Sequence, residues 1–263
     1  MSSFQPGLTT IATPPYCGAP ALPEDFWLRW NLDPWLIAGL IALAAAHGWA
    51  VAHRRGFGHG RGECLLAGWG LAALVFVSPF CALASALFAA RAGHHMLLIA
   101  VIPPLLLLAT PPRRRMPGGA AALAALAVGH AIVLWFWHVP AAYAAALADT
   151  RIYWLMQATL FGSALLLWRT VLAPTTHAGS ALAALAGTLM QTALLGTVLT
   201  FARAPLYAFH HTTTWPWGFS PLADQQLAGA LMWVLGAFPY LVAILALLAT
   251  RILRPAAPPD LAR

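Results

Sequence analysis

The chain of 263 residues is 61% hydrophobic and only 8% charged, whereas soluble domains carry about 25% charged residues. So few charges cannot cover a water-facing surface, which excludes a soluble globular protein and predicts an integral membrane protein. The formal net charge is +7, from 14 basic residues, all of them arginine, against 7 acidic ones. Arginine beside apolar spans is retained on the cytoplasmic side, so this excess is expected to set orientation in the membrane and does not indicate nucleic-acid binding.

Residues 1–33 are interpreted as a periplasmic tail with a short interfacial segment. They hold several prolines and an acidic-aromatic patch at 24–27, and they lack a basic region followed by an apolar one, so no cleavable signal peptide is expected. Trp27, Trp30 and Trp35 are expected at headgroup level, where indole rings are favoured. Cys17, Cys64 and Cys81 lie far apart without a CxxC pair, so neither a disulfide framework nor a zinc site is predicted.

Seven stretches are long and apolar enough to span the hydrocarbon core, which takes about 20 residues. They cover residues 34–53, 65–89, 93–111, 119–139, 151–171, 180–202 and 225–250. The sequence therefore predicts an all-α membrane protein, a bundle of seven transmembrane helices over residues 34–253, followed by a cytoplasmic C-terminal tail, 254–263.

The arginines predict the orientation of these spans. If the N-terminus lies outside and the C-terminus inside, most arginines fall on the cytoplasmic side. The inward group is Arg54, Arg55, Arg61, Arg113, Arg114, Arg115, Arg169, Arg251, Arg254 and Arg263. The outer side keeps four arginines together with most of the acidic residues. Six or eight spans would break this alternation.

Small residues and prolines predict some features of the packing. Alanine and glycine dominate the fourth and sixth spans, so these two are expected inside the bundle, because small residues let helices approach closely in lipid. Pro79, Pro103 and Pro104 interrupt the second and third spans, and the carbonyls they free must find other partners.

Imidazole, thioether and carboxylate side chains gather at the predicted outer face. They open the third span, close the fourth, lie in the connection before the seventh span, and open that span. These candidates are His94, His95, Met96, His138, His210, His211 and Asp224. Imidazole and thioether are ligands that suit copper, so we predict a copper site, holding Cu(I), among them. Arg91 would oppose a bound cation, and Asp224 could offset its charge, serve as a ligand, or cap its own helix.

Each histidine also has a simpler interpretation as an amphipathic residue whose ring lies among the headgroups. Adjacent helix positions lie about 100° apart, so one ring of the His94–His95 pair is expected to face the bundle and the other the lipid interface or a neighbour. His53, His59 and His177 are interpreted as ordinary residues of the inner loops. His130, deeper in its span, is expected to hydrogen-bond a facing helix.

Several motifs together resemble those of the CtaG-type cytochrome c oxidase assembly factors, over about residues 34–250. The matching segments are Ser78-Pro79, HHMLL with PPLLLL at 94–108, WFWHVP at 135–140, PLY at 205–207, and SPLADQQLAGALMW at 220–233. The DQQLAG block is the most specific of them.

The resemblance implies a multi-pass protein of the plasma (inner) membrane that helps to build a haem-copper oxidase by supplying or positioning copper, with the oxidase subunits as partners and no catalytic turnover. Arg91 stands where relatives often carry another histidine, which makes a metal-free assembly scaffold an alternative. A further alternative is a haem b-binding electron carrier with two histidine axial ligands, which requires two facing histidines at one depth. His47 and His130, the deep histidines, are poorly matched for that.

Overall fold

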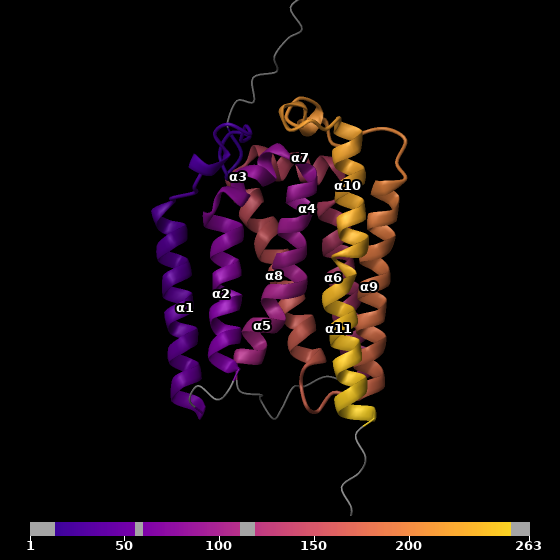
Figure 1. Cartoon of the computed structure of the whole chain (residues 1–263). Helices are drawn as coiled ribbons and strands as arrows, with labels where there is room; N and C mark the ends of the chain where they lie inside the picture. Colours follow the sequence, from indigo (N-terminus) through magenta and orange to yellow (C-terminus); the bar gives the residue numbers. More distant parts are fainter. Residues whose placement is uncertain (1–13, 56–59, 111–118, 254–263) are drawn as a thin grey trace, which may run out of the picture.

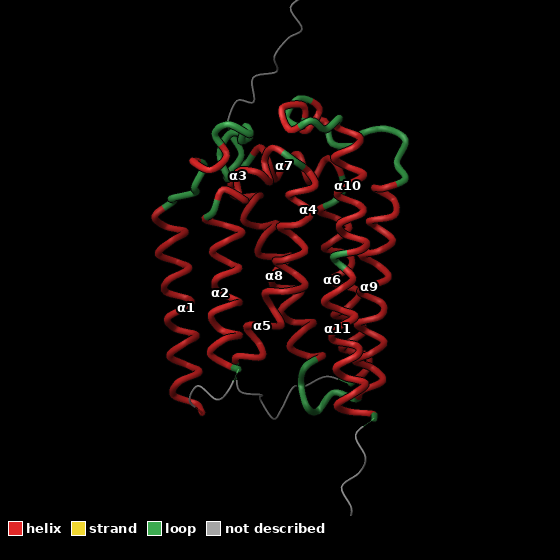
Figure 2. Tube along the Cα trace, viewed as in Figure 1, coloured by secondary structure: helices red, strands yellow, loops and turns green. Residues whose placement is uncertain are grey.

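The structure is a computed structural model that describes residues 14–55, 60–110 and 119–253. Within these ranges the chain is helical and contains no strand, and its longer helices stand side by side as a bundle (Figures 1 and 2). The predicted all-α membrane fold is confirmed. His59 and the arginines at 113–115, 254 and 263 lie outside the described residues.

The bundle is built from helices of very different lengths. The long ones are joined by short helices and turns at the two ends of the bundle. In chain order the α-helices are α1 Pro34–Arg55, α2 Arg61–Val77, α3 Pro79–Ala86, α4 Phe88–Met96, α5 Ile102–Ala109, α6 Ala120–Trp137, α7 Pro140–Ala148, α8 Thr150–Val171, α9 Ala178–Thr200, α10 Pro221–Val234 and α11 Ala237–Leu247. π-Helical turns follow α4 (η2, Leu97–Val101) and α11 (η5, Leu248–Ile252).

Two of the predicted spans are broken at their prolines, as expected. Pro79 begins α3, whose axis is bent 52° from that of α2, and the Ser78 hydroxyl caps the new helix by accepting from the Phe80 N–H at 3.2 Å. Pro103 lies in the first turn of α5, directly after the π-helical turn. Proline has no N–H to donate and its ring clashes with the preceding turn, so the chain restarts a helix at each position.

Fewer helices meet a length and hydropathy criterion for a membrane span than the seven spans predicted from the sequence. Among the described residues, five helices or helix runs are long and apolar enough to cross a membrane, and the bent pair α2 and α3 would make six. Helix α8 does not qualify, because Gln157, Thr159 and Ser163 lie along it and an arginine lies near each end. The count of seven is therefore not established, and the orientation stays a prediction.

The expectation that spans rich in small residues pack inside the bundle is confirmed at one place and is wrong at another. At the crossing of α9 and α10, a Cβ on Gly196 would lie 2.6 Å from the Gly229 carbonyl oxygen, so only glycine fits. Helix α6, by contrast, has only 22% of its most apolar stretch buried. Five of its seven alanines are exposed, because in lipid an apolar surface needs no protein cover and composition alone does not select the buried helices.

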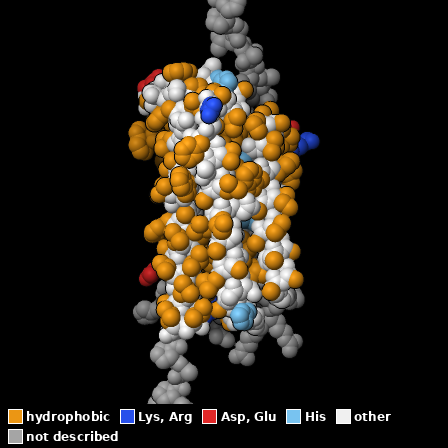
Figure 3. All heavy atoms as spheres, turned by 90° about the vertical axis from the view of Figure 1, so that its right-hand side faces the viewer, with side chains coloured by type: hydrophobic (Ala, Val, Ile, Leu, Met, Phe, Trp, Pro, Cys, Tyr) orange, Lys and Arg blue, Asp and Glu red, His pale blue; other side chains and the backbone are white. Residues whose placement is uncertain are grey.

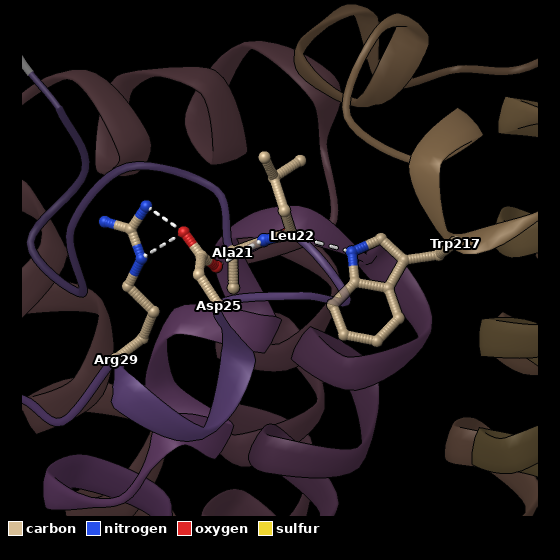
Figure 4. Close-up of polar contacts among 5 residues, drawn as sticks. All are labelled: Ala21, Leu22, Asp25, Arg29 and Trp217. Carbon is tan, nitrogen blue, oxygen red and sulfur yellow. Dashed lines mark hydrogen bonds and ion pairs between the residues drawn. The ribbon is translucent and has the colours of Figure 1, made fainter.

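Residues 14–33 are folded onto one end of the bundle. A disulfide joins Cys17 to Cys81 of α3, which corrects the expectation that the cysteines form no disulfide, since 64 residues of sequence separate two sulfurs that the fold brings together. Trp217 Nε1 donates to the Ala21 carbonyl at 2.9 Å, and Asp25 accepts from the Leu22 N–H and pairs with Arg29 (Figure 4). Hydrogen bonding from Arg29 lowers the pKa of the exposed Asp25 carboxyl.

The outer surface is that of a lipid-embedded protein. On the face at the α9 side, hydrophobic side chains cover most of the height of the molecule, and the few charged side chains lie toward its ends (Figure 3). Large apolar side chains are exposed along the helices, for example Ile41 at 64% and Met190 at 69%. A bilayer is the environment in which such a surface is stable.

Candidate functional site

Helix α4 with its continuation is the most buried of the qualifying spans. In Phe88–Ala109, 61% of the most apolar stretch is buried, against 39% for α9, the next highest. Helix α4 packs against α3 and α10 in the middle of the bundle (Figure 1). Ionisable residues within spans are favoured where protein hides them from lipid, so the predicted His94–His95 pair lies in the one helix suited to hold it.

Asp224 of α10 holds the N-terminus of α4. Its carboxylate is fully buried and accepts from the backbone N–H groups of Phe88 at 2.7 Å and Ala89 at 3.1 Å. Helix α10 itself is capped by the Ser220 hydroxyl, so the expectation that Asp224 caps its own helix is wrong. The Leu87 side chain, at the N-cap of α4, cannot accept a hydrogen bond, so Asp224 takes over this role. Its negative charge is also favourable at a helix N-terminus.

His94 belongs to a hydrogen-bond chain that reaches the disulfide. Gln157 Nε2 donates to His94 Nε2 at 3.1 Å and to the Tyr153 hydroxyl at 2.9 Å. The Tyr153 hydroxyl in turn lies 3.6 Å from Cys17 Sγ. His94 therefore has its Nε2 lone pair engaged, and its Nδ1 has no hydrogen-bond partner.

His95 and Arg91 are buried beside His94 with few partners of their own. Both ring nitrogens of His95, which is 1% exposed, lack a hydrogen-bond partner, as do Nη1 and Nη2 of Arg91. Arg91 Nε donates to the Ala84 carbonyl at 3.0 Å, and its guanidinium lies 5.6 Å from the centre of the Tyr153 ring. Both histidines are buried, so neither ring faces the lipid interface, and each faces neighbouring protein side chains instead. Buried polar atoms without partners are rare in proteins, and each is usually explained by a bound ligand, a water molecule or a functional role.

His138 extends this row of rings. Its Nδ1–H donates to the Leu134 carbonyl at 2.7 Å, which leaves Nε2 with a free lone pair. The ring centres of His94 and His95 lie 5.7 Å apart, and those of His95 and His138 lie 6.2 Å apart. A histidine anchored to a carbonyl through one nitrogen is the usual arrangement of a metal-ligating imidazole.

His210 lies next to this row but has its own partners. Its Nε2 accepts from the Tyr143 hydroxyl at 2.8 Å, and its Nδ1 lies 3.2 Å from the Thr213 hydroxyl. Both His210 and Tyr143 lie in connecting segments at the end of the bundle. Burial lowers the pKa of His210 to about 3 and raises the pKa of Tyr143 to about 12, so both are neutral at pH 7.

The remaining predicted residues are not brought into this row. The Met96 sulfur faces the junction of α10 and α11, where a Cβ on Gly236 would lie 2.8 Å from it. His211 is exposed, beside the buried His210. Among the described residues, no group of three or more His, Cys, Asp and Glu side chains is arranged to hold a metal ion. Three predicted residues, His94, His95 and His138, thus form the core of the candidate site.

The two deep histidines fix helix contacts. His130 Nδ1 lies 2.8 Å from the Ser163 hydroxyl of α8, so its expected hydrogen bond to a facing helix is confirmed. His47 Nε2 lies 2.9 Å from the Thr110 hydroxyl, and Trp69 Nε1 donates to His47 Nδ1 at 3.3 Å. The His130 ring is held between α6 and α8, whereas the His47 ring is held by Thr110 and by Trp69 of α2. The two rings therefore do not face each other through these contacts.

Sequence reasoning missed two residues that support the site, Tyr153 and Gln157 of α8. Both are at most 2% exposed, and together they link His94 to the disulfide. An amide within a span is itself a signal, because an unsatisfied polar group in hydrocarbon is costly, so Gln157 requires a buried partner. That partner lies 63 residues away in the sequence.

A family model described as cytochrome c oxidase caa3 assembly factor matches residues 45–254 of the chain. This region contains the whole row of histidines, Asp224 and both residues of α8, and it excludes Cys17 and the rest of the N-terminal segment. Searches of curated proteins and of solved structures gave no match.

Proposed function

Because the chain belongs to the family of cytochrome c oxidase caa3 assembly factors, we propose that it helps to build the oxidase by holding copper and passing it to an oxidase subunit. In this role copper is cargo, and the protein performs no turnover of its own. The chain is a multi-pass membrane protein, and the plasma membrane is where such an oxidase would be assembled.

One observation carries the copper proposal: the fully buried His95 has two free ring nitrogens and lies beside His138, whose Nε2 is also free. Neutral imidazole is the commonest metal ligand, and a second nitrogen bonded to a carbonyl holds the ring in place. His94 is the third candidate, although it would have to release Gln157 to bind through Nε2. Met96, His210, His211 and Asp224 would then act around the metal and not on it.

Arg91 favours the singly charged form of copper. Its guanidinium is always charged, is 1% exposed, and lies three residues before His94 on the same helix. Repulsion between buried charges grows with the charge of the ion, so Cu(I) is repelled half as strongly as Cu(II) at the same place. Asp224, in the same buried region, offsets part of the arginine charge.

The test is a double variant, His95→Ala with His138→Ala, compared with His53→Ala, an exposed histidine of α1. After normal membrane insertion is established, the double variant should lose Cu(I) retention by at least tenfold, and cells should make an oxidase that contains haem but lacks copper. The His53 variant should behave as the wild type. A fully copper-loaded oxidase in cells with the double variant would overturn the copper proposal and favour a metal-free scaffold.

We further propose that this end of the bundle faces the periplasm, with the N-terminus outside and the C-terminus in the cytoplasm. The Cys17–Cys81 disulfide lies at the same end as the row of histidines, and disulfides persist in oxidising compartments. A periplasm-active reporter inserted near Thr213 should therefore be active, and one fused after Arg254 should be silent. The reverse result would place the site on the cytoplasmic side.

A further inference from the structure

A pocket lies between α1, α2, α5 and α8, within the membrane-embedded part of the bundle. Its volume is about 220 Å³, and it is partly enclosed. Leu43 of α1 and Ala158 of α8 line it and are both exposed on the outside of the bundle, so the pocket opens toward the lipid. A ligand would therefore enter from the bilayer.

The walls of this pocket are unusually aromatic. Trp69 and Phe76 come from α2, and Trp154 and Phe161 come from α8. The rings of Phe76 and Trp154 are stacked, with centres 5.7 Å apart. Aromatic walls favour a flat ring over a flexible acyl chain, because ring pairs gain about 0.5–1.5 kcal/mol beyond the area they bury. An engineered cavity of about 150 Å³ binds benzene, so this one has room for a substituted single ring.

Apart from the two tryptophans, whose indoles carry an N–H group, Gln157 is the one lining residue with a polar side chain. The side-chain nitrogen of Gln157 is engaged with His94 and Tyr153, whereas its Oε1 is buried without a hydrogen-bond partner. An unpaired buried carbonyl is destabilising unless a donor reaches it. A ring hydroxyl is such a donor, and since it also accepts, it fits the amide in either orientation.

We propose that this pocket binds a lipid-soluble aromatic alcohol, a single-ring phenol or hydroquinone, whose hydroxyl bonds Gln157. The bound ring would touch two of the side chains that contact His94. Gln157 bonds the His94 ring, and Phe76 packs against it with ring centres 5.1 Å apart. Occupancy of the pocket therefore acts on the position of His94 through these two side chains.

The test compares three probes of nearly equal shape in nanodiscs that contain the protein: 2-decylhydroquinone, its dimethyl ether, and decylbenzene. Retention by protein-free nanodiscs is subtracted. The wild type should bind the hydroquinone about tenfold more tightly than either of the other two, which is the effect of one buried hydrogen bond. Equal binding of all three would mean that the hydroxyl contributes nothing and that the alkyl chain or the bare ring drives binding, and no saturable binding would mean that the pocket has no ligand of this class. Either result overturns the proposal.

Three variants locate the site. Gln157→Leu should remove the preference for the hydroquinone while leaving binding of the ether unchanged, and Ala158→Phe should block all probes by filling the mouth of the pocket. Leu155→Phe places the same phenyl ring at an exposed position of α8 outside the pocket, and it should bind as the wild type does. A hydroquinone preference that survives Gln157→Leu would place the ligand elsewhere. Since none of these measurements uses copper, their failure would leave the assembly proposal untouched.

Discussion

Helices α1 and α4 begin spans of almost the same apolar character and nearly the same length, yet they lie in opposite environments. In the span that starts at α4, 61% of the most apolar stretch is buried, against 11% for α1. The difference lies in a few polar residues, since α4 carries Arg91 and, in its last turn, His94 and His95. Lipid accepts apolar side chains as readily as protein does, so polar residues decide which span takes the centre.

The two helices are also fastened in different ways. Helix α4 is held by packing and by the carboxylate of Asp224 at its N-terminus. Helix α1 is held at separate points: the disulfide in the preceding segment, Asn31, whose backbone and side chain donate to the Val77 and Phe76 carbonyls, and His47. Removing a packed side chain should therefore weaken the attachment of α4. Removing a single link should weaken the attachment of α1.

The largest effect is expected from a packing change next to α4. Ile99, in the π-helical turn, is fully buried, whereas Ile41 of α1 is 64% exposed. Ile99→Ala should lower the free energy of unfolding by about 4 kcal/mol, because the lost contacts leave a cavity, while Ile41→Ala should change it by less than about 0.5 kcal/mol. Unfolding in mixed micelles by SDS titration measures both. Similar losses at the two sites would show that α1 is packed as firmly as α4.

The disulfide should come next. Replacing both Cys17 and Cys81 by serine should lower the free energy of unfolding by about 3 kcal/mol, because the link closes a long loop between residues 64 positions apart. It should also make the segment before α1 sensitive to protease in the folded protein. Cys64→Ser, at a free cysteine, is the matched control. Unchanged protease resistance in the double variant would mean that Asn31 and its neighbours suffice to hold α1.

The smallest of the three effects concerns two of the aspartates that cap helices, Asp224 and Asp149. Asp224→Ala should cost about 2 kcal/mol, since it leaves two buried N–H groups of α4 without an acceptor. Asp149→Ala at the exposed start of α8 removes a similar pair of bonds and should cost about 1 kcal/mol, because water replaces them there. The same unfolding titration compares them, and equal values would argue that the N-terminus of α4 is reached by water.

The sequence predicts this molecule well where the information is local. The apolar stretches identify the long helices to within a few residues, and the prolines mark the breaks, whereas the short helix α7 falls outside every predicted stretch. It fails where a contact depends on which distant surfaces meet. Three contacts join segments that no spacing rule connects: Cys17 with Cys81, Gln157 with His94, and Asp224 with the start of α4.

The bond between Asp224 and α4 has a consequence for how the protein is made. The acceptor lies 136 residues after the N–H group of Phe88 that it satisfies. At about 5–20 residues per second, the ribosome needs on the order of 10 s to deliver it. During that interval the start of α4 has no cap, so the region of His94 and His95 can take its final form only after α10, the first half of the last span, has been inserted. A chain truncated before α10 would expose an unfinished centre to quality-control proteases, which makes the presence of the last span a checkpoint for the whole molecule.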